Sequence, residues 1–163
     1  MTLPVEADAR RMTRRLALVL LLAAAGLLAA CGKPAADVPA GDFMPAADLA
    51  RLVADPAATP PTILYVGPAV LFARHVPGAI LTGEAGTPEG LAKLRAAAER
   101  LPRTADVVVY CGCCATAVCP NIRPAYAALK AMGFARVRVL DLPENFRANW
   151  KSLGYPVEQG AEP

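Results

Sequence analysis

The strongest constraint on the fold is a short apolar run that is followed at once by a cysteine-rich segment. Asp106–Tyr110 reads DVVVY, and its three consecutive valines leave no polar face. A β-branched run without alternation is typical of a strand buried on both faces of a parallel sheet. A cysteine-rich loop and a helical segment follow directly. The sequence therefore predicts an α/β domain with this strand near the centre of its sheet.

Strand-like and helical segments alternate on both sides of this run. Thr62–Val66, Ala79–Leu81 and Arg136–Leu140 are expected as further short strands. Strands that are separated by helices of about ten residues pair in parallel. We therefore expect an α/β fold with a parallel sheet of about five strands flanked by helices. The expected helices cover residues 44–54, 87–101, 122–132 and 144–153, the last of which holds Phe146 and Trp150 as core side chains.

The first thirty residues predict an export signal rather than part of the fold. Four arginines among residues 10–15 precede Leu16–Ala30, a stretch without any charged or polar side chain. This stretch is shorter than the roughly 20 apolar residues that a membrane span needs. A basic start followed by a short apolar run is typical of a signal peptide. An uncleaved anchor helix is the alternative.

The end of this leader predicts a lipid anchor. Residues 28–32 read LAACG and resemble a lipobox, which implies that Cys31 is lipidated and becomes the first residue of the mature chain. Gly32 and Lys33 follow Cys31 at the place where an inner-membrane retention Asp would stand. We therefore expect a bacterial lipoprotein of the cell envelope that faces the periplasm from the outer membrane.

The rest of the chain divides into a tether, one domain and a short tail. Residues 31–43 are small and Pro-containing, which predicts a lipidated Cys followed by a flexible tether. We expect a single domain over residues 44–158 and a tail over residues 159–163. Most of the basic excess lies in the leader, so the domain is close to neutral. No nucleic-acid partner is expected, since that would need a clustered basic face, and we expect a monomer.

Four cysteines beyond Cys31 carry the candidate chemistry. Cys111, Cys113, Cys114 and Cys119 follow the central strand and precede the next helix. The carboxyl ends of parallel strands are where ligands bind in open α/β sheets, and a helix N-terminus favours an anion such as a thiolate. The dipole alone contributes about 0.3–1 kcal/mol. A reactive thiolate therefore also needs loop amides directed at the sulfur.

Several segments together resemble the rhodanese family. Residues 107–111, VVVYC, resemble the strand and nucleophile of that family, and residues 74–80, RHVPGAI, resemble its G-H-I-P-G-A turn. Ala127–Leu129, Met132–Phe134, Val137–Leu140, Trp150 and Gly154–Val157 resemble its closing elements. The resemblance covers residues 44–158 and implies a rhodanese-like fold. It also implies a cysteine that accepts sulfane sulfur as a persulfide and passes it on, and Cys111 holds that position.

The resemblance leads to a specific functional hypothesis. We expect a membrane-tethered sulfurtransferase or persulfide carrier with Cys111 as the catalytic nucleophile, a small sulfur donor, a thiol acceptor, and no cofactor or metal. Cys113, Cys114 and Cys119 are candidates for supporting the site, and Cys114 or Cys119 for resolving the persulfide. Arg123, at the start of the next helix, is expected either to face the sulfur or to be a solvated helix end.

The loop itself argues against one common sulfur donor. It runs about ten residues, from Cys111 to Asn121, where the family loop takes about six. No charged residue lies between Cys111 and Ile122, and Val66-Gly67-Pro68 stands where the family often has an Asp. Thiosulfate is a dianion, and a loop without Lys or Arg is poorly suited to it. We therefore expect a donor other than thiosulfate.

Four other interpretations of the cysteines stay open. Cys111-x-x-Cys114 is a CxxC in an oxidising compartment, which fits a thiol–disulfide role or a structural cystine that joins Cys111 to Cys114 or Cys119. Four thiolates also suit zinc or cuprous ion. A rhodanese-like domain that has lost catalysis and only binds a partner is the fourth.

Three further polar residues lie near these motifs. His75 is the only histidine and lies in a Pro-Gly turn, so an architectural role is preferred over a general base or metal ligand. Asn121 precedes the helix and is expected to cap it. Tyr110 is expected to pack in the core, with a hydroxyl that could reach the site.

Overall fold

The computed structural model describes residues 37–160. The predicted signal peptide, the proposed lipid attachment at Cys31 and residues 161–163 of the tail lie outside the described residues. Within residues 37–160, no helix combines the length and the apolar character needed to cross a membrane.

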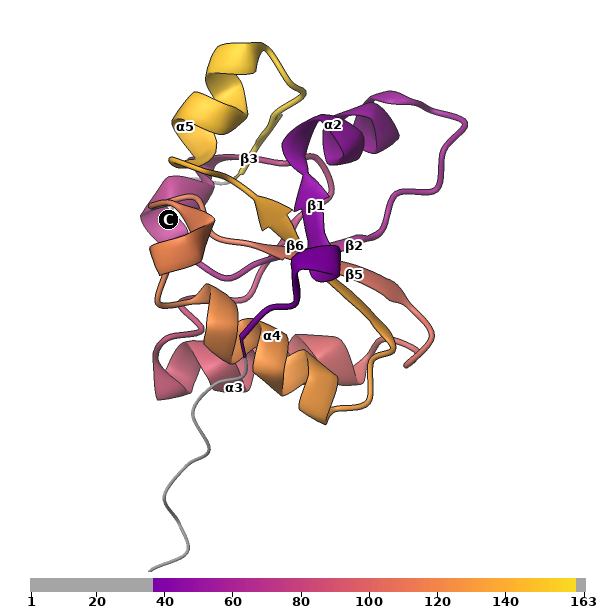
Figure 1. Ribbon diagram of the computed structural model, residues 1–163, viewed down its shortest axis with the longest axis vertical. Coiled ribbons are helices and arrows are strands. Elements are labelled where there is room, and N and C mark those ends of the chain that lie inside the picture. The colour runs from indigo at the N-terminus through magenta and orange to yellow at the C-terminus, as the bar shows by residue number, and fades with distance from the viewer. Residues whose placement is uncertain (1–36, 161–163) are drawn as a thin grey trace, which may run out of the picture. The chain divides into compact units, whose positions relative to one another are not determined.

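The core of the domain is a parallel sheet of five strands (Figure 1). The central strand β5 pairs with β2 on one side and with β6 on the other, and every described pairing in this sheet is parallel. The side chains of β5 from Val107 to Tyr110 are buried, so the prediction of a central strand covered on both faces is confirmed. In spatial order the strands are β1 (Phe43–Pro45), β6 (Arg136–Asp141), β5 (Asp106–Tyr110), β2 (Thr62–Tyr65) and β4 (Ile80–Leu81).

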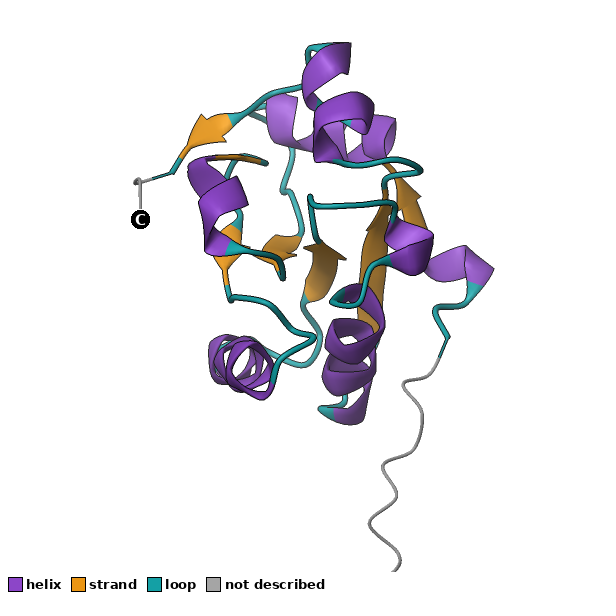
Figure 2. Ribbon diagram, turned by 90° about the vertical axis from the view of Figure 1, so that its left-hand side faces the viewer, coloured by secondary structure: helices purple, strands orange, loops and turns teal. Residues whose placement is uncertain are grey.

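Helices cover both faces of the sheet (Figure 2). α3 (Pro88–Glu99) and α4 (Ile122–Ala131) pack against each other on one face, and α2 (Ala46–Ala54) and α5 (Phe146–Asn149) lie on the other (Figure 1). The helix α3 begins as predicted, since the Thr87 side chain accepts a hydrogen bond from the Gly90 amide at 3.1 Å. The short 3-10 helices are η2 (Ala40–Asp42), η3 (Ala69–Ala73), η4 (Thr116–Val118) and η5 (Lys151–Leu153).

The two faces have separate apolar cores, and the side chains of β5 alternate between them. Val107 and Val109 pack in the core under α3 and α4, whereas Val108 and Tyr110 pack in the core under α2 and α5. This period of two is the ordinary geometry of a strand. It sends the side chain of the next residue, Cys111, to the α3 and α4 side.

The last predicted helix is broken into two short pieces. The expected helix over residues 144–153 is observed as α5 and η5, separated at Trp150, whose φ of −133° is not helical. The Asn145 side chain caps α5 by accepting from the Ala148 amide. The Trp150 ring is fully buried, and its indole N–H donates to the Pro156 carbonyl at 2.8 Å. The helix is therefore interrupted at the residue whose ring is buried.

The ordered domain begins before Met44 and extends beyond Glu158. Phe43, which was assigned to the tether, pairs with Val139 of β6, and Val38 packs against the core. The Tyr126 hydroxyl donates to Asp42. A three-residue edge strand that contains a proline has no periodic signal, which is why the sequence did not reveal it. At the other end, Gln159 pairs with β3.

A second, two-stranded sheet joins the end of the domain to its middle. β3 (Arg74–His75) pairs antiparallel with β7 (Glu158–Gln159). The buried His75 ring stacks on Phe72 with centroids 3.8 Å apart, and its Nδ1 lies 2.8 Å from the Phe72 carbonyl oxygen. These contacts agree with the architectural role that was expected for His75.

Candidate functional site

Cys111 is the first residue after the central strand β5. It therefore lies at the carboxyl end of the parallel sheet, where such folds bind their ligands. Its side chain is only 3% exposed and belongs to the core on the α3 and α4 side. The sequence-predicted nucleophile thus stands at the end of a rigid element, with a largely buried sulfur.

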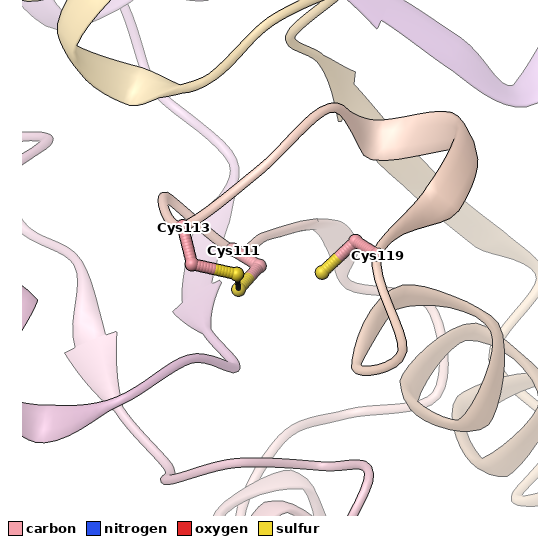
Figure 3. A group of neighbouring side chains, drawn as sticks. All are labelled: Cys111, Cys113 and Cys119. Carbon is pink, nitrogen blue, oxygen red and sulfur yellow. Dashed lines mark hydrogen bonds between the residues drawn. The ribbon is translucent and has the colours of Figure 1, made fainter.

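Two other cysteines bring their sulfur atoms to Cys111 (Figure 3). The Cys111 and Cys113 Sγ atoms are 3.2 Å apart. Cys119 reaches back from the far end of the loop, and the Sγ atoms of these three residues all lie within 4.8 Å of one another. Cys119 is buried and Cys113 is exposed. The loop thus places one buried and one exposed thiol beside the candidate nucleophile.

The neighbours of Cys111 favour its thiolate. A hydrogen bond from the Cys119 thiol, together with bonds from the Cys113 amide and the Asn121 side chain, outweighs burial and lowers the pKa of Cys111 to about 6. Burial raises the pKa of Cys113 to about 12. The bond to Cys111 raises the pKa of Cys119 far above its ordinary value. Near neutral pH, the negative charge of this trio of cysteines, Cys111, Cys113 and Cys119, therefore lies on Cys111.

Asn121 belongs to the site rather than to the helix cap. It precedes α4, but its side chain makes no capping hydrogen bond, so the expected cap is wrong. Its Nδ2 group donates to the Cys111 Sγ at 3.4 Å, and its Oδ1 accepts from the Gly86 amide at 2.8 Å. Local sequence patterns do not reveal these bonds, because Gly86 lies 35 residues from Asn121 along the chain.

The cysteine loop, which is longer than the family loop, is held to the end of β6 by hydrogen bonds from Thr116. The buried Thr116 hydroxyl donates to the Leu140 carbonyl at 3.1 Å and accepts from the Leu142 amide at 3.0 Å. Its own amide donates to the Leu142 carbonyl at 2.9 Å. These bonds hold η4 against the sheet, and η4 leads directly into Cys119. Thr116 is therefore a positioning residue that the sequence did not identify.

Gly67 makes room for the sulfur. A β-carbon at this position would lie 2.8 Å from the Cys111 Sγ and 2.8 Å from the Tyr65 hydroxyl oxygen, closer than real contacts allow. The Tyr65 hydroxyl donates to the Pro68 carbonyl at 3.0 Å. The Val66-Gly67-Pro68 sequence, which departs from the family pattern, thus lets the end of β2 approach the nucleophile closely.

Two of the predicted supporting residues lie outside this trio. Cys114 contacts Cys113, with 3.1 Å between their sulfur atoms, but it is not part of the three-sulfur group. The Arg123 Nε atom pairs with the Asp37 carboxylate at 3.0 Å, and both side chains are exposed. The structure therefore supports the solvated helix end that was one of the two expectations for Arg123.

The three-sulfur group has two chemical options besides sulfur transfer. Cys111 and either neighbour could form a disulfide, and of the two partners that the sequence suggested, Cys119 belongs to the group and Cys114 does not. Cys111, Cys113 and Cys119 could also hold a soft metal ion, since thiolates favour cuprous ion and zinc.

Comparison with known proteins identifies the fold. No family model and no curated protein matches the sequence. A crystal structure of the Alr3790 protein from Anabaena sp. matches with a TM-score of 0.55 and 23% identity, covering 72% of this chain and 93% of that one. A solution structure of the rhodanese-like domain of Alr3790 matches with a TM-score of 0.53 and 23% identity, covering 74% of this chain and 81% of that one.

Two further structures extend this likeness. The BH2092 protein from Bacillus halodurans matches with a TM-score of 0.54 and 22% identity, covering 72% of this chain and 76% of that one. A thiosulfate sulfurtransferase from Pseudomonas aeruginosa matches with a TM-score of 0.52 and 27% identity, covering 73% of this chain but only 19% of that one. The fold of residues 37–160 is rhodanese-like, as the sequence resemblance predicted.

Proposed function

We propose that this chain is a membrane-tethered sulfurtransferase or persulfide carrier that works through Cys111. The observation that carries the proposal is the environment of the Cys111 sulfur at the carboxyl end of β5. A thiol, an amide and a side-chain N–H group surround it and lower its pKa to about 6. The rhodanese-like fold, shared with a structure described as a thiosulfate sulfurtransferase, supports this chemistry.

The transfer requires a thiolate and no outside oxidant. The Cys111 thiolate attacks the outer sulfur of a donor R–S–SH, the S–S bond of the donor breaks, and R–S⁻ leaves with the bonding electron pair. Cys111 then carries the sulfur as a persulfide. An acceptor thiolate attacks the outer sulfur, a new persulfide forms on the acceptor, and the Cys111 thiolate is restored. The hydrogen bonds that stabilise this thiolate make it the better leaving group in the second step.

Cys119 has two roles in this scheme. In the resting site its sulfur lies within 4.8 Å of the Cys111 sulfur, and its thiol lowers the pKa of Cys111. When Cys111 carries a persulfide, Cys119 as thiolate can attack the Cys111 sulfur, which forms a Cys111–Cys119 disulfide and releases hydrosulfide. An outside thiol must then reduce that disulfide. Cys113, whose sulfur is 3.2 Å from that of Cys111 and exposed to solvent, is the alternative resolving thiol.

The tether is part of the proposal. A lipid on Cys31 would hold the domain at the periplasmic side of the outer membrane, where small sulfur donors and thiol acceptors would reach it. The sequence of residues 16–32 supports this placement. We propose that the domain acts as a monomer and has no nucleic-acid partner.

A thiol–disulfide role is the second candidate. It is favoured by the three sulfur atoms within 4.8 Å of one another, since two of them need little movement to form a bond. In this role Cys111 attacks a substrate disulfide, and Cys119 or Cys113 resolves the mixed disulfide. The two candidate functions share a nucleophile and differ in what it accepts.

Intact mass measurement distinguishes them. The full chain is isolated from the cell envelope without reductant, and its mass is read before and after treatment with polysulfide, thiosulfate or mercaptopyruvate. One added sulfur atom that maps to Cys111, is absent from Cys111→Ser and persists in Cys114→Ser supports sulfur transfer. A mass lower by two hydrogens that no donor changes supports the redox role and contradicts sulfur transfer.

A further inference from the structure

The three-sulfur group has the dimensions of a metal site. The sulfur atoms of Cys111 and Cys113 are 3.2 Å apart, and those of Cys111, Cys113 and Cys119 all lie within 4.8 Å of one another. Three thiolates that each lie about 2.3 Å from a single ion in their plane are about 4 Å apart. The spacing in the structure, from 3.2 Å to at most 4.8 Å, includes this value. Small rotations of the side chains would therefore place the three sulfur atoms around one ion.

The donor atoms of this group are all sulfur. Within the described part of the chain, the group contains neither a histidine nor a carboxylate. The only histidine in the sequence, His75, is held elsewhere, with its ring stacked on Phe72. Thiolates select soft ions such as cuprous ion, whereas structural zinc almost always takes four ligands. A group of three sulfur donors therefore favours Cu⁺ over Zn²⁺.

Both ends of the cysteine loop hold the group in place. Cys111 follows β5, and Cys119 follows η4, which the hydrogen bonds of Thr116 hold to the end of β6. The Asn121 Nδ2 group donates to the Cys111 Sγ at 3.4 Å, while its Oδ1 accepts from the Gly86 amide. Hydrogen bonds of this kind orient the ligands of metal sites. The loop therefore needs little additional ordering when an ion binds, which favours affinity.

Solvent reaches the group through Cys113. This side chain is exposed, whereas Cys111 and Cys119 are buried. In Figure 3 the Cys119 side chain points toward the sulfur atoms of the other two cysteines. An ion can therefore enter from solvent at Cys113 and contact the two buried sulfur atoms while the core stays closed.

We propose that Cys111, Cys113 and Cys119 form a three-coordinate site for a cuprous ion. Three Cu–S bonds form, Cys111 enters as its thiolate, and the Cys113 and Cys119 thiols each release one proton to solvent. Copper stays in the +1 state, so the step needs no oxidant or reductant. The site goes beyond the proposed function and excludes it while copper is bound, because the Cys111 sulfur is then not free to attack a donor. It differs from the sequence-based expectation that no metal is held.

Anaerobic titration of the full chain with Cu⁺ tests the proposal. The chain is purified in mild detergent, reduced, freed of reductant and titrated in competition with a chromophoric chelator of Cu⁺. We expect one ion per chain, with three sulfur neighbours by X-ray absorption. Loss of an outer partner weakens a metal site about 10–100-fold, so loss of a ligand in Cys111→Ser or Cys113→Ser should weaken binding at least about 100-fold. Cys113 is exposed, so its replacement leaves the core intact.

Cys114→Ser is the matched control, because Cys114 belongs to the same loop but not to the three-sulfur group. It should keep the native affinity. Bound copper should also protect Cys111 and Cys113 from alkylation while Cys114 stays reactive, which peptide mapping measures. Equal weakening in Cys114→Ser and Cys113→Ser, four sulfur neighbours, or Zn²⁺ that one equivalent of Cu⁺ fails to displace would each overturn the three-coordinate copper site.

The outcomes separate this proposal from sulfur transfer. If the native chain takes up sulfur at Cys111 but Cys113→Ser binds Cu⁺ as tightly as the native chain, sulfur transfer stands and the copper site fails. If copper binds with three sulfur neighbours and no donor adds sulfur to Cys111, the reverse holds. If both are present, copper should block uptake of sulfur from polysulfide, and the chelator should restore it. Undiminished uptake by the copper-loaded chain would contradict binding at Cys111.

Discussion

The peptide that joins Cys111 to Gly112 separates two regions of opposite character. On the α3 and α4 side, the sulfur of Cys111 is surrounded by neutral donors from Cys113, Cys119 and Asn121. On the α5 side, Gly112 borders a pocket lined by three cations and aromatic rings. The first region surrounds the Cys111 sulfur with hydrogen-bond donors, and the second gathers positively charged side chains.

The two regions also differ in how the chain builds them. The thiol region comes mainly from one continuous loop, residues 111–121, with Gly67 leaving space beside it. The pocket is assembled from segments that lie far apart in the sequence. Neutral donors lower the pKa of Cys111 without an ion pair. The comparison therefore indicates that the surroundings of the Cys111 sulfur and the charge of the pocket can be changed independently.

Removal of the nucleophile should separate the two regions most completely. We expect Cys111→Ser to abolish persulfide formation, because a serine hydroxyl stays protonated and cannot carry sulfane sulfur. The residues that line the pocket should keep their positions, because Cys111 is not among them. Persulfide trapping followed by peptide mapping measures the first, and amide NMR measures the second. Full transfer activity in Cys111→Ser would show that another cysteine is the nucleophile.

A change at Cys119 should destabilise the Cys111 thiolate and leave the pocket unchanged. Cys119→Ala removes the main hydrogen bond that lowers the pKa of Cys111. A hydrogen bond to a charged group contributes about 1.5–3 kcal/mol, equivalent to a rise of ~1–2 pKa units. In the native chain the alkylation rate of Cys111 should rise with pH, reach half of its maximum near pH 6 and then level off. In Cys119→Ala the midpoint should move upward.

Cys119→Ser is the matched control for that change, since its hydroxyl retains a donor. Its midpoint should stay close to that of the native chain. Equal midpoints in all three proteins would show that Cys119 does not stabilise the thiolate.

Gly67→Ala should disturb the contact between β2 and the nucleophile. The added β-carbon would overlap the Cys111 Sγ and the Tyr65 hydroxyl. Overpacking of this kind costs about 1–3 kcal/mol. Urea unfolding should show this decrease in the free energy of unfolding, and alkylation of Cys111 should slow. Gly41→Ala is the matched control, because a β-carbon there meets nothing within 4 Å. Equal stability of the two variants would contradict the close approach.

The smallest effect should come from Arg123, which belongs to neither region. Its pair with Asp37 is exposed, and exposed ion pairs contribute about 0–1 kcal/mol. We expect Arg123→Gln to leave the alkylation midpoint of Cys111 unchanged and to shift the unfolding free energy by less than about 1 kcal/mol. An alkylation midpoint raised by half a pH unit or more would show that Arg123 helps to stabilise the Cys111 thiolate.

Local patterns were enough to predict most of the fold. The apolar run at Asp106–Tyr110 gave the central strand, and Thr87-Pro88 gave the start of α3. Both are contained in a few neighbouring residues. β1 and the break at Trp150 were not predicted, because a three-residue edge strand has no period and the break depends on burial of a ring against distant residues.

The sequence predicted the candidate site only where its residues lie close together along the chain. Proximity in sequence predicted Cys113, Cys114 and Cys119 as neighbours that support Cys111. The sulfur atoms of Cys113 and Cys119 do lie with that of Cys111, whereas Cys114 is not part of this group. Asn121 was assigned to a helix cap because nothing nearby revealed that Gly86 and Cys111 would bond to its side chain. The cations of the pocket were invisible for the same reason, since folding alone brings Arg74 beside Arg147.

The pairing of β3 with β7 bears on the order in which the molecule forms. Arg74 lies opposite Gln159, at the end of the described chain, and the Gly160 amide donates to the Ala73 carbonyl. Contacts between residues so distant along the chain close late, since loop entropy opposes them. The groups that surround the sulfur all precede Pro143. A chain that emerges amino end first during synthesis or export would therefore complete the surroundings of the Cys111 sulfur before it pairs β3 with β7.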